Sequence, residues 1–201
     1  MSNSLQDINT IGPVQQAEPA EDQRSQAQKD YEEGRGYVER GESALAAVSL
    51  HNALQGFEKE GNKEGIANAS NQLGHACLQR KEYEKALENY QRAWDICAEF
   101  DDPTSLQALS VRRVEAYAGL KAFGKAVGVC LDLIDEYQKN NDPQGTVTVL
   151  EMMADIYQKS GDLDKAADSY RTIASIHANF NHPKIAEAYR QKAEQLNDNN
   201  A

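Results

Sequence analysis

The chain has 201 residues and a net charge of −11, from 32 acidic and 21 basic residues. So large an acidic excess argues against nucleic acid or an anionic membrane as the main partner, because either would repel the chain. No run of residues approaches the roughly 18 apolar positions that a membrane-spanning helix needs.

The cysteines and the N-terminal sequence indicate a reducing compartment. Cys77, Cys97 and Cys130 are odd in number and fall on apolar helix faces, as expected of small buried hydrophobic residues. The first residues lack the basic start and the apolar core of a signal peptide. We therefore expect a cytoplasmic protein.

Residues 1–25 are expected to form a flexible acidic and polar arm. The segment contains few residues that could build a core. Leu5, Ile8 and Ile11 nevertheless recur every three residues, so a short part of the arm could dock on an apolar surface. The sequence leaves both interpretations open.

From about residue 26 the sequence repeats with a period of 40 residues. Pro103, Pro143 and Pro183 show this interval, and so do alanines at positions 46, 86, 126 and 166. A fixed period of this length with helical patterning is typical of a solenoid of helix pairs. The predicted units are four helical hairpins at about 26–62, 63–102, 103–142 and 143–182, a capping helix at 183–197 and a tail at 198–201.

Each hairpin is predicted to contain a first and a second helix. In the second hairpin, Tyr83, Ala86, Leu87 and Tyr90 follow the spacing of an amphipathic helix. Asp102 and Asp142 each precede a proline, which is typical of a helix N-cap followed by the first helical residue. First helices are expected at about 26–40, 64–80, 103–120 and 143–160, and second helices at about 43–60, 83–99, 123–139 and 163–179.

The second hairpin resembles the tetratricopeptide repeat family in Leu73-Gly74, Cys77, Ala86 and Tyr90. The fourth hairpin shows the same pattern in Met153-Ala154, Tyr157, Ala166 and Tyr170, whereas the third is degenerate, with Arg113-Val114 in place of Leu-Gly. The resemblance covers about residues 26–197. Because the usual repeat has about 34 residues, this chain is a long variant. The resemblance implies an all-α fold, a right-handed α-solenoid of four hairpins plus a capping helix, with a concave groove lined by first helices.

The resemblance also implies a protein-interaction scaffold or adaptor that binds a peptide or a partner helix in this groove. Asn and Gln side chains can pair with both N–H and C=O groups of a bound backbone, although they are equally stable as solvated helix positions. A clamp for a C-terminal carboxylate, which some family members have, is mostly missing here. The candidate groove residues are Tyr31, Arg35, Asn68, Asn71, Gln72, His75, Leu78, Val111, Arg112, Glu115, Glu151 and Asp155.

An apolar patch predicts an alternative function. Val129 and Leu131 occupy positions in the third hairpin that should face outward on the convex side. Such a patch could mediate self-association, as in a homodimer, or receive the N-terminal arm. Two scattered exposed apolar residues are an equally ordinary explanation.

Signals for catalysis are weak. His177 and His182 lie five residues apart without an evident third metal ligand, and no glycine-rich phosphate loop is present. We therefore expect no enzyme activity, no metal and no cofactor, and a protein or peptide as the partner.

Overall fold

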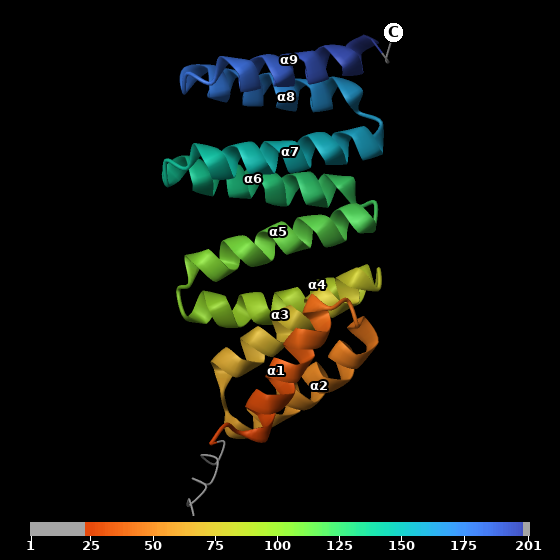
Figure 1. Ribbon diagram of the computed structural model, residues 1–201. Coiled ribbons are helices and arrows are strands. Elements are labelled where there is room, and N and C mark those ends of the chain that lie inside the picture. The colour runs from red at the N-terminus through yellow and green to blue at the C-terminus, as the bar shows by residue number, and fades with distance from the viewer. Residues whose placement is uncertain (1–22, 199–201) are drawn as a thin grey trace, which may run out of the picture.

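The computed structural model describes residues 23–198, which form nine α-helices and no strand (Figure 1). The predicted all-α repeat fold is confirmed, and every helix end lies within one residue of its expected position. Residues 1–22 of the predicted arm and residues 199–201 lie outside the described part. The helices are α1 (Gln26–Glu39), α2 (Ser43–Glu60), α3 (Lys63–Gln79), α4 (Tyr83–Glu99), α5 (Pro103–Gly119), α6 (Phe123–Lys139), α7 (Pro143–Ser160), α8 (Leu163–Asn179) and α9 (Pro183–Asp198).

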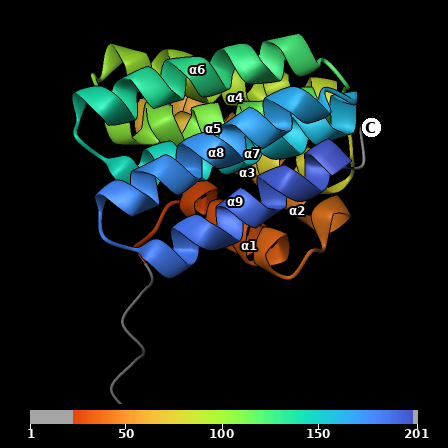
Figure 2. The same ribbon diagram turned by 90° about the horizontal axis from the view of Figure 1, so that it is seen from above.

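The helices stack in chain order into an elongated array. Each helix packs mainly on the one before and the one after it, so the array grows in one direction from α1 to α9 (Figure 1). Seen along that direction, the later hairpins lie over the earlier ones (Figure 2). Contacts are therefore almost all between neighbours, as in other solenoid proteins.

The turns between consecutive helices share one backbone geometry. In each turn the amide after a left-handed residue bonds to the carbonyl five residues earlier, as in Glu82 to Cys77 (2.9 Å) and Asp102 to Cys97 (3.1 Å). This is the Schellman motif that ends many helices. Turns within and between hairpins are thus equivalent, and the backbone repeats every 20 residues. The left-handed residues are Gly41, Gly61, Lys81, Asp101, Lys121, Asn141, Gly161 and Asn181.

Helix capping differs between first and second helices and therefore follows the 40-residue period. The first helices α1, α3, α5 and α7 are capped by Ser25, Asn62, Asp102 and Asp142, whose side chains accept from the amide three residues later at 2.8–3.2 Å. The N-cap residues of α2, α4, α6 and α8 make no such bond. Each cap stabilises its helix by about 1 kcal/mol, and the predicted caps at Asp102 and Asp142 are confirmed.

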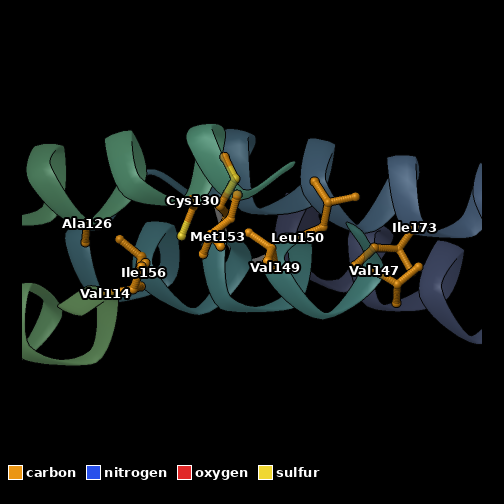
Figure 3. Close-up of a cluster of buried hydrophobic side chains, with 10 residues drawn as sticks. Val114, Ala126, Cys130, Val147, Val149, Leu150, Met153, Ile156 and Ile173 are labelled. Carbon is orange, nitrogen blue, oxygen red and sulfur yellow. The ribbon is translucent and has the colours of Figure 1, made fainter. Parts of the chain in front are cut away.

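The core consists of three apolar clusters that follow one another along the array. The first joins α1, α2 and α3, and the second centres on Tyr90 between α4 and α5. The third spans α5 to α8 and includes Val114, Cys130, Met153 and Ile173 (Figure 3). Close approach of helices depends on small residues, since a Cβ atom on Gly74 would lie 2.4 Å from the Tyr90 ring.

Candidate functional site

The predicted groove residues lie on first helices that are neighbours in space. Gln72 on α3 lies close enough to Tyr31 on α1 to act on the pKa of its hydroxyl. The charge of Arg112 on α5 acts on His75 of α3. We call the side of α1, α3, α5, α7 and α9 that carries these residues the first-helix face.

At the N-terminal end of the first-helix face, Tyr31 and Arg35 both contact other side chains of the chain. The half-buried Tyr31 ring packs edge-on against Phe57, with ring centroids 6.3 Å apart. Burial raises the pKa of Tyr31. Arg35 is exposed and lies 3.5 Å from Glu39 on the same helix. The ring contact joins α1 to α2, and the ion pair lies within α1.

Asn68 and Asn71 border a small cavity further along the first-helix face. The cavity has a volume of about 60 Å³ and is also lined by Ser105 and Ala108 of α5. Asn68 is exposed and Asn71 is half-buried. Neither side-chain amide has a hydrogen-bond partner among residues 23–198, so both can bind an added group.

The centre of the first-helix face is a polar cluster from three consecutive helices. Nδ1 of His75 lies 3.5 Å from the hydroxyl of Tyr90, and the two rings meet edge-on. Burial, and then the charge of Arg112, lower the pKa of His75 to about 4. Arg112 donates to both carboxylate oxygens of Glu115, at 3.0 and 3.2 Å. At neutral pH the cluster therefore contains a neutral imidazole beside an internally paired guanidinium.

Apolar positions lie beside this polar cluster. Leu78 is half-buried against the core around Tyr90, and Val111 is half-buried against the core around Cys130. The first-helix face thus alternates polar groups with partly exposed apolar ones.

The C-terminal end of the first-helix face is aromatic. Glu151 accepts a hydrogen bond from the hydroxyl of Tyr189 on α9. Burial, and then this bond, raise the pKa of Tyr189 to about 12. The Tyr189 ring stacks on His177 and lies 6.0 Å from the ring of Tyr170. Asp155 instead bonds to Lys159 of its own helix at 2.6 Å.

Neither Tyr170 nor Tyr189 was among the predicted groove residues, although Tyr170 is part of the repeat pattern. The 40-residue period does indicate that α9 continues the series of first helices, because Lys192 follows Arg112 by two periods and Gln72 by three. The capping helix α9 therefore stands where the first helix of a fifth hairpin would stand, and it extends the first-helix face.

The two residues predicted for an outward contact, Val129 and Leu131, both lie on α6. Leu131 is 51% exposed. Val129 is half-buried and packs against the core around Cys130. It also borders a cavity of about 380 Å³ that Trp94 and Arg113 line. Leu131 is thus the more exposed of the two residues.

Residues 23–198 show neither a cluster of metal ligands nor a membrane-spanning helix. These residues contain no group of three or more His, Cys, Asp or Glu side chains placed to hold a metal ion. His177 and His182 do meet, with their Nδ1 atoms 3.4 Å apart. None of the nine helices is both long and apolar enough to cross a bilayer.

The comparisons with known proteins agree with this architecture. The family model for the tetratricopeptide repeat matches residues 149–184, which comprise the later part of α7, all of α8 and the first residues of α9. No curated protein sequence matches the chain. The resemblance predicted from the sequence is thus confirmed: residues 149–184 match the tetratricopeptide repeat by sequence, and residues 23–198 fold as an array of similar helical hairpins.

Solved structures share this fold at low sequence identity. TPR-like repeats of a Podosopora anserina protein assigned as a kinesin light chain match with a TM-score of 0.71 and 16% identity, over 88% of this chain and 90% of that one. The apo form of RapI matches with a TM-score of 0.65 and 12% identity, over 87% of this chain and 54% of that one. MamA from Desulfovibrio magneticus RS-1 matches with a TM-score of 0.55 and 12% identity, over 88% and 97%. At identities this low, the structural matches show a common fold and nothing more.

Proposed function

We propose that the chain is a non-catalytic protein-interaction scaffold that binds a peptide or a helical segment of a partner protein along the first-helix face. The main support is the pair of side-chain amides of Asn68 and Asn71, which have no partner among the described residues and border a small cavity. An Asn amide can donate to a backbone carbonyl and accept from a backbone N–H at the same time. Extended surfaces of this kind are what solenoid proteins use for binding.

The polar cluster beside these amides adds support. Because its pKa is about 4, His75 is neutral at physiological pH and can form a hydrogen bond without adding charge. Arg112 is oriented by Glu115 and can make charge-assisted bonds to a ligand. Leu78 and Val111 offer apolar contact next to these groups. The free cysteines favour a reducing, cytoplasmic setting.

Peptides selected from a displayed library of random sequences test the proposal. Affinities of the selected peptides are measured by calorimetry for the wild-type chain and for Asn71→Ala, Arg112→Glu and Leu131→Glu. Loss of one or two hydrogen bonds to the ligand should weaken binding by about tenfold or more in the first two variants. Leu131→Glu, which lies away from this face, should bind as the wild type does. If all three variants bind equally, the first-helix face is not the peptide site.

Self-association is the second candidate function, with Leu131 as the contact residue. Its support is the 51% exposure of this leucine, a large apolar side chain on α6. Sedimentation velocity over a range of concentrations tests it. A wild-type dimer that becomes a monomer with Leu131→Glu would support the alternative, and a wild-type monomer at tens of micromolar would exclude it.

A further inference from the structure

The first-helix face ends in two tyrosine rings that already hold a cation. Nζ of Lys192 lies 4.6 Å from the ring centroid of Tyr189 and 5.5 Å from that of Tyr170. Both distances are in the range of cation–π attraction. We call Tyr170 of α8 and Tyr189 of α9 the tyrosine pair.

The rings of the tyrosine pair are fixed by their neighbours. The Tyr189 hydroxyl donates to Glu151, and the His177 ring stacks on Tyr189 with a centroid distance of 5.7 Å and an interplanar angle of 6°. The Tyr170 hydroxyl accepts a hydrogen bond from Nε2 of Gln158 at 3.1 Å. Both rings are half-buried. Because the rings are already ordered, a ligand that binds them does not lose free energy in ordering them.

Lys192, in contrast, is held only loosely. Its side chain is exposed and forms no ion pair with any carboxylate of residues 23–198. A lysine ammonium on a flexible stem is well hydrated and can leave the rings for solvent. Another cation can therefore occupy the space over the tyrosine pair.

The location and charge of the tyrosine pair fit a basic partner. Lys192 shares the 40-residue column of Gln72 and Arg112, and Glu151 shares that of Asn71. A chain bound along the first-helix face would thus reach the tyrosine pair at its C-terminal end. The Glu151 carboxylate and the net charge of −11 both favour a positively charged ligand.

We propose that the tyrosine pair is a recognition site for an arginine or lysine side chain of the partner, and that Lys192 is a placeholder which this side chain displaces. The inference rests on the proposed peptide-binding function and adds that the peptide is basic. It also makes the C-terminal end of the face an anchor that sets the peptide's position along the array.

A short acetylated and amidated Gly-Ser peptide with spaced arginines is the probe, and the same peptide with citrulline in place of arginine is its neutral control. We expect the arginine peptide to bind and the citrulline peptide not to bind. Lys192→Met removes the competing ammonium and should tighten binding by about three- to tenfold. Tyr170→Leu should weaken it, whereas Tyr189→Phe, which keeps the ring, should retain it.

Matched variants separate recognition by the tyrosines from general attraction to an acidic chain. Lys184→Met removes one positive charge from an exposed site on the same helix and should change affinity much less than Lys192→Met. Lys192→Arg keeps a cation over the rings and should bind as the wild type does. Thermal melting followed by circular dichroism verifies that α9 stays folded in each variant.

Two results would overturn the inference: binding that Lys192→Met weakens or leaves unchanged, or equal effects of Lys184→Met and Lys192→Met. Failure here is distinguishable from failure of the proposed function. If library peptides still depend on Asn71 and Arg112 while the arginine peptide does not bind, the scaffold stands and only the basic partner is wrong.

Discussion

The second and third hairpins follow the same 40-residue pattern but divide the volume between their two helices in opposite ways. In the second hairpin, α3 contributes Gly74 and α4 contributes Tyr90, whose ring fills the space above the glycine. In the third, the corresponding residues are Val114 on α5 and Cys130 on α6, both fully buried. A larger residue on the first helix therefore accompanies a smaller one on the second.

This difference explains why the third hairpin looks degenerate by sequence and still folds like the others. Close packing requires that the facing side chains together fill the space between the helices. A Gly–Tyr pair and a Val–Cys pair both meet this requirement. The family pattern thus describes one solution for the interface, and substitutions in the second hairpin can test whether the other solution also fits there.

Gly74→Val should have the largest effect. A Cβ atom at this position would lie within 3 Å of several Tyr90 ring atoms, so the ring or the helix must move. We expect the free energy of unfolding to fall by about 3 kcal/mol, at the upper end for overpacked cores. The double variant Gly74→Val with Tyr90→Cys copies the third hairpin and should recover at least about 1 kcal/mol of this loss. Urea denaturation measures both.

Gly124→Ala is the matched control for this prediction. Gly124 lies in α6, and a Cβ atom there would have no neighbour within 4 Å. Because alanine favours helix, the variant should be more stable by about 0.5–1 kcal/mol. A Gly74→Val variant as stable as the wild type would show that Tyr90 can move freely, against the packing argument.

The position of His75 should make the second hairpin acid-sensitive. Its pKa is about 4 in the folded chain against 6.5 for the free side chain, so the unfolded chain binds more protons between these values. The stabilising contribution is complete above pH 6.5 and is lost as the pH falls towards 4. Since the ring is partly exposed, we expect a loss of about 1–2 kcal/mol.

Comparison with His75→Gln isolates this effect from the other titrating groups. Denaturation at several pH values should show a steeper decline for the wild type than for the variant between pH 6.5 and 4. In the third hairpin the corresponding residue is Glu115, which Arg112 pairs directly. If the stability of the two proteins declined equally with pH, His75 would have the same pKa in the folded and the unfolded chain.

The sequence predicted the fold because the residues that define it repeat. Helix ends, the caps Asp102 and Asp142, and the alanine column are all local signals with one period. The 20-residue backbone period was not predicted, since the turns between hairpins include Asp101 and Asn141, which adopt left-handed conformations without being glycine. Only the structure shows that these turns match those with glycine.

The candidate site was less predictable because its contacts join different helices. The exposure of Val129 depends on how α6 packs against its neighbours. The spacing of residues along one helix does not predict that packing. The bond between Tyr189 and Glu151 joins residues 38 positions apart on α9 and α7. Its prediction requires treating α9 as a further first helix rather than as a solvated cap.

Ser70→Ala should stabilise the second hairpin by about 1 kcal/mol. The Ser70 hydroxyl is fully buried and has no hydrogen-bond partner among the described residues. Burial of an unpaired hydroxyl destabilises the folded chain by about 1–3 kcal/mol. The alanine variant removes this cost but also loses the packing contacts of the oxygen atom, so the net gain is smaller. Ser110 is the counterpart in the third hairpin and borders a cavity, so Ser110→Ala should be close to neutral. An equal change for both serines in thermal melting would contradict this difference.

The smallest expected effect concerns the turns within the second and third hairpins. Lys81 and Lys121 adopt φ angles of 60° and 57°, where the first and fourth hairpins have Gly41 and Gly161. Glycine removes the left-handed strain of about 1 kcal/mol but adds freedom to the unfolded chain. Lys121→Gly should therefore stabilise by only about 0.5 kcal/mol.

Lys121→Ala serves as the control, because it removes the same charge and keeps the Cβ atom that causes the strain. We expect no gain in stability from this variant. The gains from Lys81→Gly and Lys121→Gly should add, since the two turns belong to different hairpins and share no partner. Denaturation midpoints of the two single variants and the double variant measure this. A double variant no more stable than either single one would show that turn strain does not limit the stability of these hairpins.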